Sequence, residues 1–594
     1  MSILAPLNYP LGTDVLRGGW RQRLEVAEAQ QHHRGRGDRR VNALIRVLSS
    51  WSRGKISTRE MYYQCEGHKL DGNDVPGIVR LGSLGSPSCD KNCFTNMVRL
   101  LRTCGVPQML HALPPSSPVS HCVPATSVMS LFFKHNRQMF LRVWKADKAS
   151  LREFWSRFSS STAGAEYKSH HPYLAGRSPA DLETTVPLTM WEDGGPFTKS
   201  KSTLVLCWGP LLHAGSELES RYVHHATSTV NKDDPMAIAA SWDYFFEEMD
   251  LLAKGLDRSG EPLALELDGT MWRGTLIFGQ SDFEMHFKWG LKTYAAGEEP
   301  CNLCLCDQTL RPYTDLRRIA EWRSTVIMIT INLFKQRCRF PHPIQNNHYF
   351  CKWFIRFDLM HNADHNGVTG TAIASQLAYF IFYEDRLGGT QQIRLDKLNA
   401  LKDVYYGSVH VSSKVGELKM QYILPNGPSS WAELHGPTIK AAGTRHLAPW
   451  LISLTREYCT NGSMEHKTMR SLARSLNSMY DIIYEADVFL SADELARLEA
   501  SVIRIGECFQ LLRDFSRRRG DYLWHVLYKS HYLQHLPEQA SLINPKCVQN
   551  YCEEGLMGRI TNIWESCSDG PMNSTICHSA AIKYLVTLIL ELDL

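Results

Sequence analysis

The chain has 594 residues, of which 43% are hydrophobic and 21% are charged, so it can build a large core and is not a disordered or fibrous protein. Its 65 Lys and Arg residues nearly balance 61 Asp and Glu residues, which excludes a strongly basic or acidic chain. Seventeen cysteines without a secretory signal favour reduced thiols and metal ligands over disulfides.

The first residues contain no cationic segment followed by a long apolar one, so no signal peptide is predicted. The longest apolar runs, TVIMITINLF and AAIKYLVTLIL, are too short to span a bilayer. We therefore expect an intracellular protein with no membrane segment. A nuclear location follows only from a DNA-related function, because no clear localisation motif is present.

Positive charge is concentrated near the N-terminus. Residues 1–60 carry eleven Arg or Lys residues against five Asp or Glu residues. Residues 1–40 are predicted to form a basic, disordered arm in which Arg34, Arg36, Arg39 and Arg40 could neutralise DNA phosphates. A solvated tail without a nucleic-acid role is an equal alternative.

Residues 41–110 are predicted to be helical, since VNALIRVLSSW and FTNMVRLLRTCG place apolar residues at helical spacing. In this region Cys65-x-x-His68 and Cys89-x-x-x-Cys93 could form a zinc-bound DNA-contact module, although accidental spacing is common in a chain rich in Cys and His. Residues 111–165 are predicted to be a linker rich in Pro and Ser, followed by helices.

The middle of the chain changes to strand-like chemistry. TTVPLTMWED, STLVLCWGPLL, GTLIFGQSD and WFIRF are short apolar segments rich in residues that favour strands, and a helical segment around SWDYFFEEM separates the second from the third. Long helical patterns follow, first to about residue 460 and then through residues 461–594. This order predicts an α/β core over residues 166–460 with large helical insertions and a mostly helical C-terminal half.

Three aspartates come directly after strand-like segments. They are Asp193, Asp282 and Asp358. Enzymes that transfer phosphoryl groups hold two divalent metals between such carboxylates, and Mg²⁺ prefers oxygen ligands. The alternative is structural, because aspartate often ends a strand as a turn former or as a helix N-cap.

A set of potential zinc ligands lies between and beyond these aspartates. Cys301 and Cys304 form a C-x-x-C pair, and His361 and His365 form an H-x-x-x-H pair, which together give the Cys₂His₂ spacing of a tetrahedral zinc site. Cys306 is a further thiol that could substitute. The alternative is that the thiols are buried and free and that the histidines only share a helix face.

The ordered set of these blocks resembles DDE-type DNA transposases of the CACTA (En/Spm)-like group. The resemblance rests on WEDGGPFTKSKSTLVLCW, on FGQSDFEMHFKWGLKTYAAGEEPCNLC, on FDLMHNADHNGVTG, and on HVLYKSHYLQHLPEQASLINP followed by EEGLMGRITNIWES. It covers roughly residues 170–590. It implies an RNase H-like core, catalytic Mg²⁺ or Mn²⁺ at Asp193 and Asp282, structural Zn²⁺, DNA as partner, and a homo-oligomer that cuts two DNA ends together. Asp358 could either join these catalytic acids or orient His361.

One position departs from this resemblance. Related proteins have an acid after K-A-A, where IKAAGTRHL places Gly443. Glu433, Asp364, Glu553 and Glu554 are the candidate replacements. Two alternatives therefore remain open, namely a domesticated DNA-binding protein without catalysis, and a zinc-stabilised scaffold for protein interactions.

Overall fold

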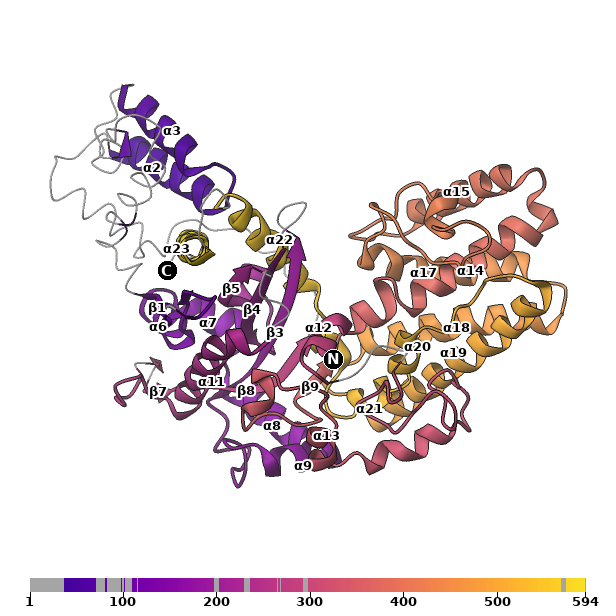
Figure 1. Cartoon of the computed structure of the whole chain (residues 1–594), viewed down its shortest axis with the longest axis horizontal. Coiled ribbons are helices and arrows are strands. Elements are labelled where there is room, and N and C mark those ends of the chain that lie inside the picture. Colours follow the sequence, from indigo (N-terminus) through magenta and orange to yellow (C-terminus); the bar gives the residue numbers. More distant parts are fainter. Residues whose placement is uncertain are drawn as a thin grey trace.

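The structure is a computed structural model that describes residues 37–70, 81–82, 98, 101, 109–114, 116–196, 202–228, 235–263, 265–267, 269–291, 297–567 and 573–592. Figure 1 shows a part built around a sheet and, beside it, a part made of helices. The fold is mixed α/β with a mostly helical C-terminal half. Within the described residues, every helix is too short or too polar to cross a membrane.

A five-stranded mixed sheet lies at the centre of the first part, with the strand order β5-β4-β3-β8-β9 (Figure 1). Its strands are β3 (Thr185–Pro196), β4 (Ser202–Pro210), β5 (Tyr222–Ser228), β8 (Arg273–Ser281) and β9 (Ile355–Phe357). Strands β3, β4 and β5 are antiparallel, whereas β8 is parallel to β3 and to β9. Four of these strands were predicted, but β5 was not.

Helices and two short ribbons surround the sheet. The ribbons pair β1 (His111–Ala112) with β2 (His121–Cys122) and β6 (Glu266–Leu267) with β7 (Thr270–Met271). The helices of this part are α2 (Gly37–Ser52), α3 (Thr58–Leu70), α6 (Ala125–His135), α7 (Arg137–Val143), α8 (Lys148–Ser160), α9 (Thr162–His170), α10 (Glu217–Ser220), η3 (Pro235–Ile238), α11 (Ala239–Lys254), α12 (Phe283–Lys288), η4 (Glu321–Met328), α13 (Ile331–Gln336), η5 (Pro343–Asn346), α22 (Tyr551–Glu565) and α23 (Asn573–Leu592).

After β9 the chain leaves the sheet and forms the helical part, which has its own hydrophobic core. Its elements are the π-helix η6 (Met360–Asp364), α14 (Val368–Tyr383), η7 (Asp385–Leu387), α15 (Gln391–Ser408), α16 (Met420–Ile423), α17 (Ala441–Tyr458), α18 (Met464–Glu485), α19 (Ala492–Arg519), α20 (Tyr528–Leu533), α21 (Leu536–Ala540) and η8 (Pro545–Val548). Helix α14 is central because it is apolar and buried over nearly its whole length.

Local sequence signals set the ends of the long helices. Helix α19 begins at a capping box in which Ser491 and Glu494 satisfy each other's backbone amides, and it ends at Gly520, whose φ of 85° is left-handed. Beyond the helical part, α22 returns to the sheet and packs against β3 and β4. This return places residues from the C-terminal end of the chain next to the ends of the central strands.

Candidate functional site

The parallel strands bring the three predicted aspartates to one edge of the sheet. Trp191 pairs with Gln280, and Gln280 pairs with Arg356, so these residues define one level across β3, β8 and β9. The residues two positions beyond this level are Asp193, Asp282 and Asp358. Side chains at equal levels of neighbouring parallel strands lie side by side, so the sheet itself assembles this acidic edge.

Helix α22 adds a fourth acid, Glu554. Burial raises the pKa of Asp193 well above its usual range, and the charges of Asp282 and Glu554 raise it further. The pKa of Glu554 is also raised, by partial burial and by the charges of Asp358 and Asp282. These like charges oppose ionisation of Asp193 and Glu554, and a bound cation would favour it.

Asp358 uses both of its oxygens within the protein. It accepts hydrogen bonds from the backbone amides of Met360 and His361, each at 3.0 Å, and from the amide of Asn550 at 2.9 Å. The imidazole Nδ1 of His361 contacts it as well. Asp358 therefore orients His361 and anchors the start of α22, so it acts as a positioning residue.

His361 lies between two acids. Its Nδ1 faces Asp358 and its Nε2 lies 3.4 Å from Oε1 of Glu554. Burial lowers the pKa of His361, but the charges of Asp358, Asp282 and Glu554 outweigh this effect and raise the pKa to about 9. The ring is thus a cation near neutral pH and holds Glu554 toward the acidic edge.

A buried ion pair fixes the helix that carries Glu554. Glu553 contacts the guanidinium of Arg221, and both side chains are at most 2% exposed. Nε2 of Gln280 donates a second hydrogen bond of 2.9 Å to Glu553. Removing one partner of such a pair leaves a buried charge and costs roughly 3–5 kcal/mol. Glu553 is therefore structural, while its neighbour Glu554 is available to the site.

Of the remaining candidate acids, Glu433 interacts with Lys529, as Asp282 and Asp358 do. Gly443 and Asp364 are occupied by packing and by hydrogen bonds within the protein. A Cβ atom at Gly443 would meet a methyl group of Val415 at 3.0 Å, so a longer side chain there would be directed into packed residues. Asp364 is buried and accepts hydrogen bonds from the hydroxyls of Tyr480 and Tyr551. Gly443 therefore marks tight helix packing in the helical part.

Three buried cysteines and a histidine form a metal-ligand cluster. The ligand atoms of Cys301, Cys304, Cys306 and His531 all lie within 4.8 Å of one another. His535 is adjacent, because its Nε2 lies 3.5 Å from Sγ of Cys301 and 3.2 Å from Nε2 of His531. Sulfur and imidazole donors at these separations suit tetrahedral Zn²⁺. Buried Cys and His residues of this chain could thus hold a metal such as zinc.

The surroundings of this cluster resemble the supporting shell of a metal site. The amide of Leu303 donates to Sγ of Cys301 at 3.3 Å, and Nη2 of Arg337 donates to the carbonyls of Cys301 and Cys304 at 2.7 and 3.2 Å. Burial opposes ionisation of the Cys301 thiol, but hydrogen bonds from Cys304 and Cys306 outweigh it and hold its pKa well below the usual value. The thiol pKa values of Cys304 and Cys306 are raised, that of Cys304 chiefly by burial and that of Cys306 chiefly by its contact with Cys301, so Cys301 is the thiol that ionises first.

The structure corrects the predicted histidine partners of the cysteines. His361 contacts Asp358 and Glu554, and His365 is exposed, so neither belongs to the cysteine cluster. The histidines beside the thiols are His531 and His535. Both lie within HYLQHLP, an H-x-x-x-H spacing that was visible in the sequence but far from the cysteines.

A second buried group could also hold a metal ion. Ligand atoms of Cys122, His224 and His225 lie within 4.8 Å of one another. The register between β4 and β5 shifts at these two histidines. Such a bulge can direct two consecutive side chains to the same side of a strand. Both ring nitrogens of His225 are buried, and no hydrogen-bond partner for either is found among the residues that the structure describes.

Several predicted N-terminal sites lie outside the described residues. Arg34, Arg36, Cys89 and Cys93 are among them. Arg39 and Arg40 fall in α2, but only their backbone is described. The sequence matches no family model and no curated protein. The function is therefore argued from the geometry of the acidic edge and of the cysteine cluster.

Proposed function

We propose that this protein is a transposase-like enzyme that cleaves and joins DNA strands with Mg²⁺ or Mn²⁺ held by Asp193, Asp282 and Glu554. The proposal includes an RNase H-like core, in which acids lie at the ends of neighbouring strands. One observation carries it. The register of β3 and β8 brings Asp193 and Asp282 to the same edge of the sheet, and helix α22, which packs against β3, brings Glu554 to His361 beside them.

The donor set suits hard divalent cations, since three carboxylates offer the oxygen ligands that Mg²⁺ prefers. When bound, such ions activate the attacking water and stabilise the leaving oxygen. The protein's own groups position these ligands. Asp358 orients His361, and His361 holds Glu554. Lys529, whose charge interacts with Asp282 and Asp358, can contact a phosphate beside the acids.

In this proposal zinc has a structural role. The cysteines lie on the loop after α12, and the histidines lie on α20 and at the start of α21, so zinc would fasten the helical part to the sheet part. DNA is the partner in this proposal, which places the protein in the nucleus. A homo-oligomer follows from the need to cut two DNA ends together. Gly443 does not argue for an inactive protein here, because Glu554 supplies the third acid.

The proposal predicts Mn²⁺-dependent nicking of supercoiled plasmid by the unmodified protein and its loss in Asp282→Asn. Asparagine keeps the helix cap at this position, where Oδ1 of Asp282 accepts from the amide of Met285 at 2.7 Å, so the variant is expected to fold. Asp396→Asn, at an exposed position on α15, is the matched control and should nick normally. Equal nicking by the unmodified protein and Asp282→Asn would refute the proposed function.

A further inference from the structure

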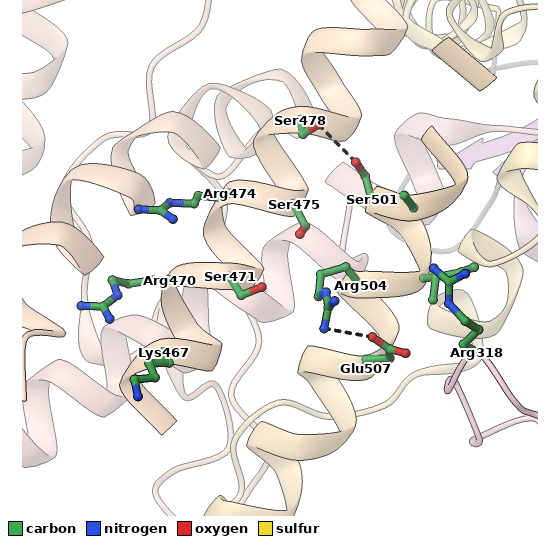
Figure 2. A pocket seen from close by; sticks show the side chains of 12 residues that line it. Arg318, Lys467, Arg470, Ser471, Arg474, Ser475, Ser478, Ser501, Arg504 and Glu507 are labelled. Carbon is green, nitrogen blue, oxygen red and sulfur yellow. Dashed lines mark hydrogen bonds and ion pairs between the residues drawn. The ribbon is translucent and has the colours of Figure 1, made fainter. Parts of the chain in front are cut away.

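A positively charged groove lies between α18 and α19 in the helical part, far along the chain from the acids. It has a volume of about 570 Å³. Its charged lining residues are Arg318, Lys467, Arg470, Arg474, Arg504 and Glu507. Figure 2 shows Ser471 and Ser475 between Lys467, Arg470 and Arg474 on one side and Arg504 on the other. Serines thus form the floor, and cations form both rims.

Most of this positive charge is not neutralised by the protein. Arg504 pairs with Glu507 at 3.2 Å, and Arg470 donates to the carbonyl of Cys459 at 2.5 Å. Within the described part of the chain, no ion pair involves Lys467 or Arg474. Arg470 and Arg474 are also like charges four residues apart on one helix, an arrangement that is slightly destabilising without a counter-charge. The groove therefore provides charge for an external anion.

The shape and lining identify the class of anion. Small-molecule sites are mostly apolar, whereas this groove is lined by cations and hydroxyl groups. The lining residues of α18 run from Lys467 to Ser478, a length of roughly 16 Å at the rise of an α-helix. That length spans about five phosphates of one DNA strand measured along the duplex axis. Lysine, arginine and serine are side chains that contact phosphate oxygens without reading sequence.

We infer that this groove binds the phosphate backbone of double-stranded DNA, an assignment that rests on the proposed function. The groove and the acidic edge lie on different sides of α18. Tyr480 contacts Asp364 next to the acids, and it lies two residues, or about 200° of helix rotation, from Ser478 in the groove. The groove therefore holds a DNA segment other than the strand at the carboxylates.

The test measures binding of a random-sequence DNA duplex of about 30 base pairs. Fluorescence anisotropy gives the Kd at each concentration in a salt series. Lys467→Ala/Arg474→Ala is expected to raise Kd at least tenfold at about 100 mM salt and to reduce the slope of log K against log salt by about 2. Both side chains are exposed, so the variant should keep the melting temperature of the unmodified protein. The charge-preserving Lys467→Arg/Arg474→Lys should bind as the unmodified protein does.

Lys148→Ala/Lys254→Ala is the matched control, because it removes the same charge from exposed positions on α8 and α11. An equal loss of binding in this control, or an unchanged salt slope in the groove variant, would overturn the assignment. Capture of a polyglutamate peptide in place of DNA would also overturn it.

The groove and the acidic edge can fail separately. Groove-dependent binding by a protein that never nicks DNA would support the groove and refute the enzyme. Nicking by a protein whose groove variant binds normally would support the enzyme and refute the groove.

Discussion

Glu554→Gln is expected to slow Mn²⁺-dependent plasmid nicking by on the order of a thousandfold, because loss of one metal carboxylate removes several kcal/mol of transition-state stabilisation. Glutamine keeps the volume of the side chain and favours helix, so α22 should remain in place. The measurement is the single-turnover nicking rate. Glu565→Gln, at an exposed position on the same helix, should change the rate less than threefold. A Glu554→Gln rate near that of the unmodified protein would remove Glu554 from the site.

Cys304→Ser is expected to remove one equivalent of bound zinc and to lower the free energy of unfolding by roughly 4–5 kcal/mol or more, the scale associated with loss of a structural metal. Sγ of Cys304 lies 3.3 Å from Nε2 of His531. Elemental analysis of the purified protein and urea denaturation measure the two effects. Serine is a poor zinc ligand, so the variant loses the thiolate that contacts His531.

Two further variants separate this prediction from a general effect of cysteine loss. Cys338→Ser, at a partly buried cysteine outside both ligand groups, should keep zinc and stability. His361→Asn should also keep zinc, because His361 pairs with Asp358 and Glu554. Loss of zinc in His361→Asn would support the pairing of the cysteines with His361 and His365 that the sequence predicted. Normal zinc content in Cys304→Ser would refute the zinc cluster.

The sequence predicted what depends on local patterns. Strands β3, β4, β8 and β9 are short runs rich in β-branched and aromatic residues. Asp282 and Asp358 follow β8 and β9 directly, whereas Asp193, predicted to follow a strand, lies inside β3 opposite Val205 of β4. Parallel pairing then places these aspartates together without any further information. Strand β5 was not predicted because its sequence, YVHHATS, does not alternate between apolar and polar residues. Its two consecutive histidines are both buried, whereas a regular strand would direct one of them outward.

Long-range contacts could not be predicted from local patterns. Cys304 and His531 meet across 227 residues, and Asp358 meets Asn550 at the start of α22 across 192 residues. The sequence analysis chose His361 and His365 because they are the H-x-x-x-H pair nearer to the cysteines along the chain. Nothing in the sequence shows that a much longer loop closes to bring His531 to Cys304. Glu554 was one of four candidate acids, and only the return of α22 to the sheet distinguishes it.

The measurement that tests the central claim most directly is an anomalous-difference map from crystals soaked in Mn²⁺. The proposed site predicts manganese peaks bounded by the carboxylates of Asp193, Asp282 and Glu554, with the peaks absent in Glu554→Gln. Manganese bound elsewhere while these three carboxylates remain without a peak would contradict the metal site and, with it, the proposed enzyme.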